Sequence, residues 1–297
     1  MSVQTLLELV LGGISLGGIY ALMSLALSLA LATTNMLNVA HGAFLVMGAA
    51  LSTFLLRHTR LPWPAGLALF IGFCALVGWL FERVCVRPLL GRAPDRALVG
   101  SILITFGFAL TFEAALGYYW AKFVDPQPTF SLPVAMPPFA LFGVSLSGTR
   151  LAILAFVGVA VLLFHLFLTR TPMGKMARAL AQDYDGALVL GINPQAVSAA
   201  IFTLGILATA LSGLFFILAS PLGPHDGLRL TLIAMTVIVI GGVGSLPGVL
   251  AGGVLLGLGD VFTAFLVGAV WSPVTYVLVF FVVLLLRPEG LAGIRHT

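Results

Sequence analysis

Long apolar segments separated by short polar ones make up most of this sequence. A helix needs about 20 apolar residues to cross the roughly 30 Å hydrocarbon core of a bilayer. We predict about nine such spans, within a range of eight to ten because some are short or re-entrant, at 9–31, 36–56, 62–81, 98–118, 150–168, 196–219, 229–243, 248–268 and 272–286. The pattern predicts an all-α polytopic integral membrane protein with a single transmembrane domain over residues 1–297.

The composition supports a membrane location and excludes a soluble fold. The chain is 60% hydrophobic and 8% charged, whereas about a quarter of the residues in soluble domains are charged. Its basic residues are scattered over the polar loops rather than gathered on one face. Nucleic acid is therefore not an expected partner. The expected partner is the lipid bilayer.

The placement of Lys and Arg predicts the orientation of the chain in the membrane. Segments 82–97 and 170–194 and the C-terminal end together hold nine basic residues, and the loops expected on the opposite side hold five. Lys and Arg favour the cytoplasmic side. We therefore expect the C-terminus and segment 170–194 in the cytoplasm, the N-terminus outside, and an external loop over 119–149.

Residues 170–194 are a polar segment between two long apolar ones, and we call them the polar loop. Thr171-Pro172 is a good helix start. Small or apolar residues then recur at spacings of three and four, with charged residues on the opposite face. This pattern, interrupted at Asp183-Tyr-Asp-Gly186 and ended by Gly191 and Asn193-Pro194, predicts two short amphipathic helices with a bend. Such a loop either lies on lipid headgroups or docks a soluble partner.

Several polar or glycine-rich positions fall within the predicted spans, where they are costly and indicate function. Asn38 and His41 share a helix face beside Gly42, and this segment either starts a helix hairpin capped by Asn38 or belongs to a translocation path. The Gly-rich stretch 241–253 cannot form a regular lipid-exposed helix. Asp260 either faces the path or pairs with a polar group on a neighbouring helix. The predicted path or gate residues are Asn38, His41, Gly42, Gly241, Gly242, Gly244, Ser245 and Asp260.

Two pairs of glycines have the spacing of close helix contacts. Gly13-x-x-x-Gly17 and Gly253-x-x-x-Gly257 both lie within predicted spans. Small residues at this spacing let helix backbones approach each other in lipid. We interpret both pairs as packing sites.

The sequence contains no recognisable catalytic or metal site. A nucleotide-binding P-loop needs a Lys followed by Ser or Thr after a Gly-rich turn. The chain has only two lysines: Lys122 follows Ala121, and Lys175 precedes Met176. None of the five histidines has metal-ligand spacing with another His or Cys. We expect no catalytic, cofactor-binding or metal residues, so an ATP-driven step would need another polypeptide.

Four ordered motifs resemble those of one family and cover nearly the whole chain. Asn38-Val-Ala-His41-Gly42 resembles the Asn-x-Ala-His-Gly signature of the branched-chain amino acid permeases of ABC importers. Asp185-Gly186-Ala187-x-x-x-Gly191 is similar to the Glu-Ala-Ala-x-x-x-Gly loop of such permeases, with Asp for Glu and Gly for the first Ala. The remaining two matches are Gly241-Gly-Val-Gly-Ser-Leu-Pro-Gly248 and Arg287-Pro288-x-Gly290-Leu291. Chain length and the first motif favour the shorter, LivH type.

The resemblance implies a permease subunit of an ATP-driven ABC importer for branched-chain or related small neutral amino acids, in a bacterial cytoplasmic (inner) membrane. It implies as partners a second homologous permease, two ATP-binding subunits that use the ATP, and an external binding protein that delivers the substrate. The polar loop would then be a cytoplasmic coupling loop. The expected ATPase-docking residues are Arg178, Asp183, Asp185, Gly186, Ala187 and Gly191.

Two alternatives stay open on the sequence. An importer of the same type for amides, urea or aromatic acids has the same motifs. A stand-alone, ion-coupled secondary transporter would need an ion-coupling residue, for which Asp260, Glu113 and His41 are the candidates.

Overall fold

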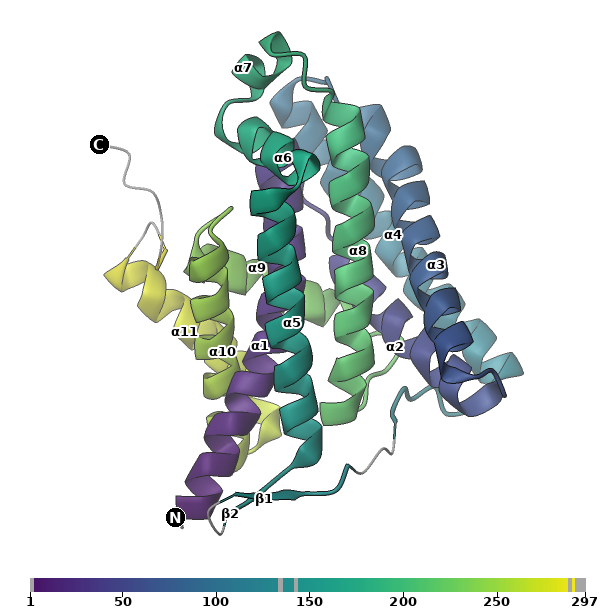
Figure 1. The fold of residues 1–297 in the computed structure, drawn as a ribbon, viewed down its shortest axis with the longest axis vertical. Helices are drawn as coiled ribbons and strands as arrows, with labels where there is room; N and C mark the ends of the chain where they lie inside the picture. The colour runs from purple at the N-terminus through teal and green to yellow at the C-terminus, as the bar shows by residue number, and fades with distance from the viewer. Residues whose placement is uncertain (1–2, 133–135, 142–143, 288–289, 292–297) are drawn as a thin grey trace. The chain divides into compact units, whose positions relative to one another are not determined.

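The computed structural model describes residues 3–132, 136–141, 144–287 and 290–291. Helices dominate it, as predicted (Figure 1). They are α1 (Val3–Thr34), α2 (His41–His58), α3 (Trp63–Phe81), α4 (Pro94–Phe123), α5 (Gly148–Arg170), α6 (Pro172–Gln182), α7 (Tyr184–Val189), α8 (Pro194–Ala219), α9 (Gly227–Gly241), α10 (Leu246–Leu266) and α11 (Ser272–Leu286). A π-helix at Glu82–Val86 and 3-10 helices at Arg87–Leu89 and Ala269–Trp271 complete the helical structure described. Strands β1 (Phe139–Leu141) and β2 (Val144–Leu146) form one small antiparallel hairpin.

The predicted number of spans is wrong, although each predicted span corresponds to a helix. Among the described residues, seven helices are long and apolar enough to cross a membrane, not nine or a number between eight and ten. The two that fall short are α2 and α9. Helix α2 begins at His41 and ends with Arg57 and His58. Helix α9 has 15 residues, which at 1.5 Å per residue span about 22 Å, less than the bilayer core of roughly 30 Å.

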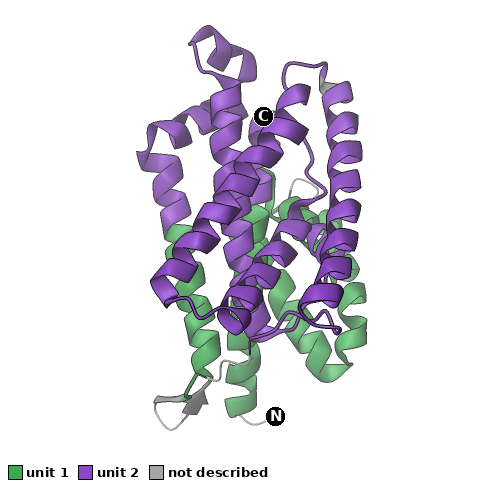
Figure 2. Cartoon of the chain, turned by 90° about the vertical axis from the view of Figure 1, so that its right-hand side faces the viewer, with its two compact units in different colours: residues 1–25, 133–162, 233–297 green, residues 26–132, 163–232 purple. Residues whose placement is uncertain are grey.

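The chain forms two compact units, each assembled from separate stretches of sequence (Figure 2). Unit 1 comprises 1–25, 133–162 and 233–297, and unit 2 comprises 26–132 and 163–232. Helices α1, α5 and α9 each contribute residues to both. The expected single transmembrane domain stays a prediction.

In unit 1, α1 packs closely on α10 through the two predicted glycine pairs. A Cβ added to Gly17 would lie 2.6 Å from the carbonyl oxygen of Gly253. One added to Gly257 would collide with the backbone of Gly13 and Gly17. The four glycines therefore form a single crossing in which backbone meets backbone, as small residues allow in lipid.

In unit 2, α2 is the most enclosed helix and packs chiefly on α8, which in turn packs on α3. A Cβ on Gly48 of α2 would collide with the carbonyl of Ala210, and one on Gly213 of α8 with the carbonyl of Leu45. Aromatic rings fill the adjacent core, where the ring centroids of Phe44 and Phe81 are 4.8 Å apart. This core fixes the position of α8, which begins directly after the polar loop.

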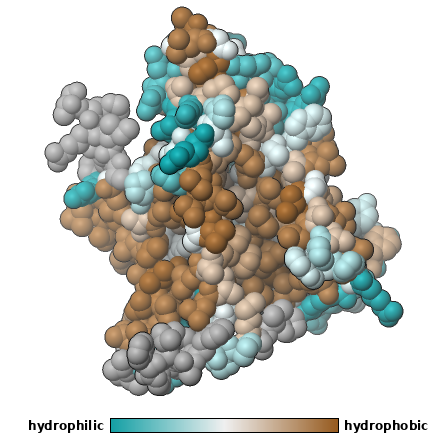
Figure 3. Space-filling model, in the orientation of Figure 1, coloured by the Kyte–Doolittle hydropathy of each residue, from teal (hydrophilic) through white to brown (hydrophobic). Residues whose placement is uncertain are grey.

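The outer surface of these helices is apolar, the reverse of a soluble protein. Helix α3 exposes a stripe of large hydrophobic side chains at spacings of three and four residues: Leu69, Phe73, Leu76 and Leu80. Hydrophobic residues cover much of the visible face in Figure 3, and hydrophilic ones gather in the region where Figure 1 places α6. A lipid environment accounts for this distribution.

Candidate functional site

The polar loop forms two short helices, as predicted, and the break between them falls at Asp183, within the predicted interruption at Asp183-Tyr-Asp-Gly186. Thr171 caps α6, since its hydroxyl accepts the backbone N–H of Gly174 at 3.0 Å. Asp183 is extended and caps α7, since its carboxylate accepts the N–H of Gly186 at 2.9 Å. A Cβ on Gly186 would collide with that carboxylate. Gly186 thus belongs to the first turn of α7 and makes room for the cap.

Gly191 ends α7, as predicted, with a φ of 79° that disfavours any residue with a side chain. The N–H of Ile192 bonds to the carbonyl of Ala187 at 3.1 Å, and the N–H of Gly191 to that of Leu188 at 2.9 Å. This pair of bonds is the Schellman motif. Asn193 then caps the next helix, α8, by accepting the N–H of Gln195 at 3.0 Å.

The six predicted docking residues differ in exposure. Arg178, Asp183, Asp185 and Gly191 are exposed, Gly186 is half-buried and Ala187 is buried. Ala187 belongs to the same core cluster as Ala177 and Leu180 of α6 and Val197 of α8. The charged members therefore present a water-facing surface, and Ala187 attaches α7 to the core.

The sequence reasoning missed an exposed apolar tip on α7, formed by Leu188, Val189 and Leu190. Val189 is 88% exposed and Leu190 80%. Hydrophobic atoms with hydrophilic neighbours are visible in Figure 3 at the end where Figure 1 places α7. The signal was available, because three consecutive apolar residues before a helix-ending glycine cannot all face the core.

The predicted path residues Asn38, His41 and Gly42 lie buried in unit 2, where α1 ends and α2 begins. The Oδ1 atom of Asn38 accepts the N–H of Ala40 at 3.0 Å, which shapes the turn before α2. The Nε2 atom of His41 is 2.9 Å from the hydroxyl of Thr209 on α8. The N–H of Gly42 donates to the hydroxyl of Thr231 on α9 at 2.8 Å. Asn38 therefore shapes the turn before α2 but does not cap the helix, whose N-cap residue is Ala40 without a side-chain capping bond. The close packing expected at Gly42 fits this geometry.

Hydroxyl side chains satisfy the backbone of the non-helical link between α1 and α2. The N–H groups of Leu37 and Val39 donate to Ser101 and Thr105 of α4, at 3.2 and 2.9 Å. Thr231 donates to the carbonyl of Val39 at 2.9 Å. Irregular backbone at membrane depth persists only where protein groups or water satisfy it. These three hydroxyl residues were not identified from the sequence.

In unit 1, the glycine-rich stretch forms the predicted break between α9 and α10. Gly242 and Gly244 have φ values of 93° and 78°. The Ser245 hydroxyl caps α10 by accepting the N–H of Gly248 at 3.2 Å. Gly241 is the last residue of α9 and packs on the backbone at Val249. Of the C-terminal motif, residues 288–289 lie outside the described residues.

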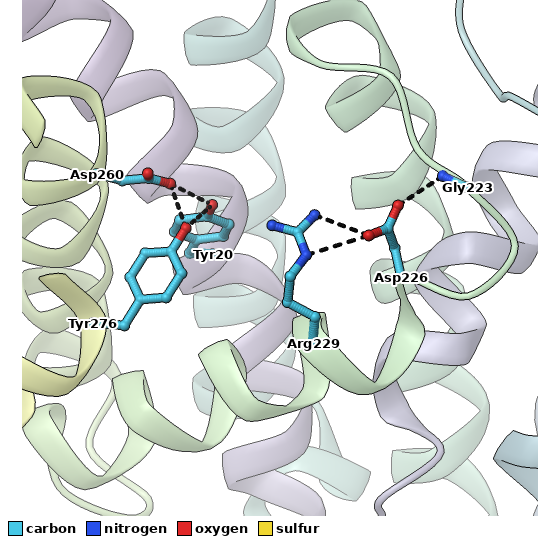
Figure 4. Close-up of polar contacts among 6 residues, drawn as sticks. All are labelled: Tyr20, Gly223, Asp226, Arg229, Asp260 and Tyr276. Atoms are coloured by element: carbon cyan, nitrogen blue, oxygen red, sulfur yellow. Dashed lines mark hydrogen bonds and ion pairs between the residues drawn. The ribbon is translucent and has the colours of Figure 1, made fainter. Parts of the chain in front are cut away.

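Asp260 pairs with polar groups on neighbouring helices, one of the two roles expected for it (Figure 4). Its Oδ2 atom accepts hydrogen bonds from the phenols of Tyr20 on α1, at 2.9 Å, and Tyr276 on α11, at 2.6 Å. All three side chains are buried in unit 1. The carboxylate therefore joins three helices, and the two tyrosines were missed in the sequence.

The structure groups the predicted residues into two sets. The docking residues lie in unit 2 together with the predicted path residues Asn38, His41 and Gly42. The other predicted path residues lie in unit 1: Gly241, Gly242, Gly244, Ser245 and Asp260. The described residues contain no group of three or more His, Cys, Asp or Glu side chains that could hold a metal ion. The roles assigned to these residues stay predictions.

Comparison with known proteins relates residues 9–287 to one family, the permease component of branched-chain amino acid transport systems. The permease protein LivH of the high-affinity branched-chain amino acid transport system of Salmonella typhimurium is 27% identical, with 97% of this chain and 95% of LivH covered. The corresponding protein BraD of Pseudomonas aeruginosa is 29% identical over the same shares. Among solved structures, PsaBC from Streptococcus pneumoniae in complex with Fab aligns with 92% of this chain and 90% of that chain, at 12% identity and a TM-score of 0.49, which supports no inference.

The family match covers nearly the whole chain, and the helices described above agree with it. Multi-pass helical structure and transport of amino acids follow from the family and from the apolar helices. The chain belongs to the family of permease components of branched-chain amino acid transport systems.

Proposed function

We propose that this chain is the membrane-spanning subunit of an ATP-driven importer of branched-chain or related small neutral amino acids. An external binding protein delivers the substrate, and a second homologous permease completes the translocation path. The family, and the branched-chain amino acid transport systems to which LivH and BraD belong, support the substrate class. The protein lies in a bacterial cytoplasmic membrane with its C-terminus in the cytoplasm.

The chain itself performs no chemistry in this proposal, and two partner subunits bind and hydrolyse ATP. Neither of its two lysines stands in a P-loop pattern. The work of ATP must therefore reach this chain through a contact, and the polar loop is the candidate. We accordingly call it the coupling loop.

The observation that best supports a docking role for the coupling loop is the exposed apolar tip of α7. Val189 and Leu190 are almost fully exposed although the helix is anchored to the core through Ala187. Exposed apolar residues bordered by charged ones are typical of interaction sites. Since the tip stands next to Asp183 and Asp185 on a capped helix, it suits a groove on a soluble subunit better than a lipid surface.

Reconstitution tests the function directly. The chain is coexpressed with a second permease, an ATPase and a binding protein of branched-chain amino acid systems encoded in the same genome, placed in proteoliposomes and tested for uptake of L-leucine. We expect uptake that requires ATP inside the vesicles and the binding protein outside. Uptake by the purified chain with only an ion gradient would instead establish the secondary-transporter alternative. Competition by amides, urea and benzoate separates the alternative substrates.

The docking role is tested in the same system with the double variant Val189→Asp/Leu190→Asp. Charged side chains at the tip should abolish most ATPase recovery with the affinity-tagged permease and lower uptake at least 10-fold, the equivalent of about 1.4 kcal/mol. Because both side chains are exposed, membrane insertion and thermal stability should be unchanged. Lys175→Asp, an exposed charge change on α6, serves as the matched control. Normal ATPase recovery in the double variant would contradict the docking role.

A further inference from the structure

Unit 2 contains a buried acidic residue, Glu113, that is not part of the coupling loop. Glu113 lies on α4 and is only 5% exposed. The backbone N–H of Leu228, in the first turn of α9, hydrogen-bonds to its carboxylate. The other oxygen, Oε1, has no hydrogen-bond partner among the described residues. A buried acceptor left unsatisfied is destabilising, and more so when it is charged, so this oxygen can gain a hydrogen bond from a donor.

Among the described residues no basic side chain forms an ion pair with Glu113, although the imidazole of His225 acts on it electrostatically. The nearby acid Asp226 is already occupied, since it forms an ion pair with Arg229 at 3.2 Å and accepts the N–H of Gly223 at 2.7 Å (Figure 4). The ends of α2 and α9 come close to Glu113: a Cβ on Gly227 would collide with Oε1 and lie 3.0 Å from the backbone nitrogen of Ala43. Helix N-termini carry only partial positive charge.

Glu113 lies close to water-exposed residues. Gly117, one helical turn further along α4, lies against His225: a Cβ on Gly117 would be 3.5 Å from its Nε2. His225 is exposed. One turn of helix corresponds to about 5.4 Å. Glu113 is therefore one helical turn along α4 from a residue that contacts an exposed side chain, at the end of unit 2 where α8 has finished and α9 begins.

We propose that Oε1 of Glu113 accepts a hydrogen bond from the ammonium group of the transported amino acid. This inference rests on the proposed function, which supplies a zwitterionic substrate. An ammonium offers three N–H donors, and a hydrogen bond between charged partners is stronger than a neutral one. The carboxylate would bind during passage through unit 2, and it would distinguish amino acids from carboxylic acids of the same shape that lack the amine.

The test measures binding of radiolabelled L-leucine and of 4-methylpentanoate, its analogue without the amino group, to the purified permease–ATPase complex without the binding protein. Glu113→Gln keeps the size and can still accept the Leu228 N–H, so the cap of α9 survives while the charge is lost. We expect leucine binding to weaken roughly 10-fold or more, as for the loss of a charge-assisted hydrogen bond. Binding of 4-methylpentanoate should be unchanged.

Two further variants separate recognition from packing. Glu82→Gln changes the other buried acid of unit 2 that has an unpaired oxygen, at the opposite end of α3 and α8, and should leave binding of both compounds unchanged. Glu113→Asp keeps the charge and should lose less leucine affinity than Glu113→Gln. Equal leucine binding by Glu113→Gln and the native complex, or equal losses for both Glu113 variants, would overturn the proposal. Failure of the native complex to bind leucine would overturn this inference alone. Failure of the complete system, with its binding protein and ATP, to transport leucine would contradict the proposed function and this inference with it.

Discussion

At the scale of single residues, the local caps could be predicted from the sequence and the polar clusters could not. Thr171 and Gly191 act on groups within five residues of themselves. The residues adjacent in the sequence are therefore enough to predict these caps. The contacts of Leu37 with Ser101 and of Val39 with Thr231 join residues 64 and 192 positions apart. Only the fold brings such groups together, which is why the hydroxyl residues and the two tyrosines on Asp260 were missed.

The Asp260 cluster leads to a prediction about stability. Tyr276→Phe removes one of two phenol donors to a buried carboxylate and should destabilise the protein by about 1–3 kcal/mol. Tyr20→Phe should have a similar effect. The loss of stability in the double variant should differ from the sum of the two single losses, because both donors share one oxygen. Thermal unfolding in detergent measures this. The exposed Tyr119, changed to Phe, is the control; equal stability of Tyr276→Phe and Tyr119→Phe would show that the cluster contributes nothing.

At the scale of elements, hydrophobic length located every long helix but not what happens at the helix ends. The predicted spans 36–56 and 229–243 correspond to α2 and α9, which are short or polar-ended because the chain unwinds before His41 and turns after Gly241. The bend of the coupling loop was predicted over Asp183-Tyr-Asp-Gly186, partly from the low helix propensity of Gly186. The structure confines it to Asp183, whose carboxylate caps the next helix, and places Gly186 in the first turn of that helix.

The Schellman motif at the end of α7 predicts a difference between two variants at one position. Gly191→Val forces a branched side chain into a backbone with φ 79° and should cost about 1–2 kcal/mol locally. Gly191→Asn is tolerated in that conformation and should be nearly neutral. Because no atom lies within 4 Å of an added Cβ, the difference reports backbone strain and not a clash.

We expect Gly191→Val to lower ATPase recovery and uptake several-fold while membrane insertion stays intact. Coupled pull-down and uptake assays measure both properties, with Gly191→Asn as the matched control. Normal uptake by the Val variant would show that the end of α7 is not part of the coupling contact.

At the scale of the whole molecule, the class could be predicted from composition alone, whereas the division into two units could not. Each unit gathers stretches far apart in the sequence, so no composition change marks a boundary. Within unit 2, α4 and α8 run in the same direction. Arg87, just before α4, bonds to Gln195 at the start of α8 at 2.6 Å, and Phe130, after α4, pairs with Leu222, after α8. With 30 and 26 residues, these helices are about 45 and 39 Å long, enough to cross a bilayer.

This arrangement predicts which exposed positions a reagent can reach from each side of the membrane. Gln127 follows α4 and Gln182 ends α6, so they lie at opposite ends of unit 2. From the basic residues near Gln182 we expect that end to face the cytoplasm. In intact spheroplasts a membrane-impermeant maleimide should label Gln127→Cys and should label Gln182→Cys only after lysis. The native chain is the control, because Cys74 and Cys85 are buried. The opposite labelling pattern would invert the orientation and move the coupling loop away from any cytoplasmic ATPase.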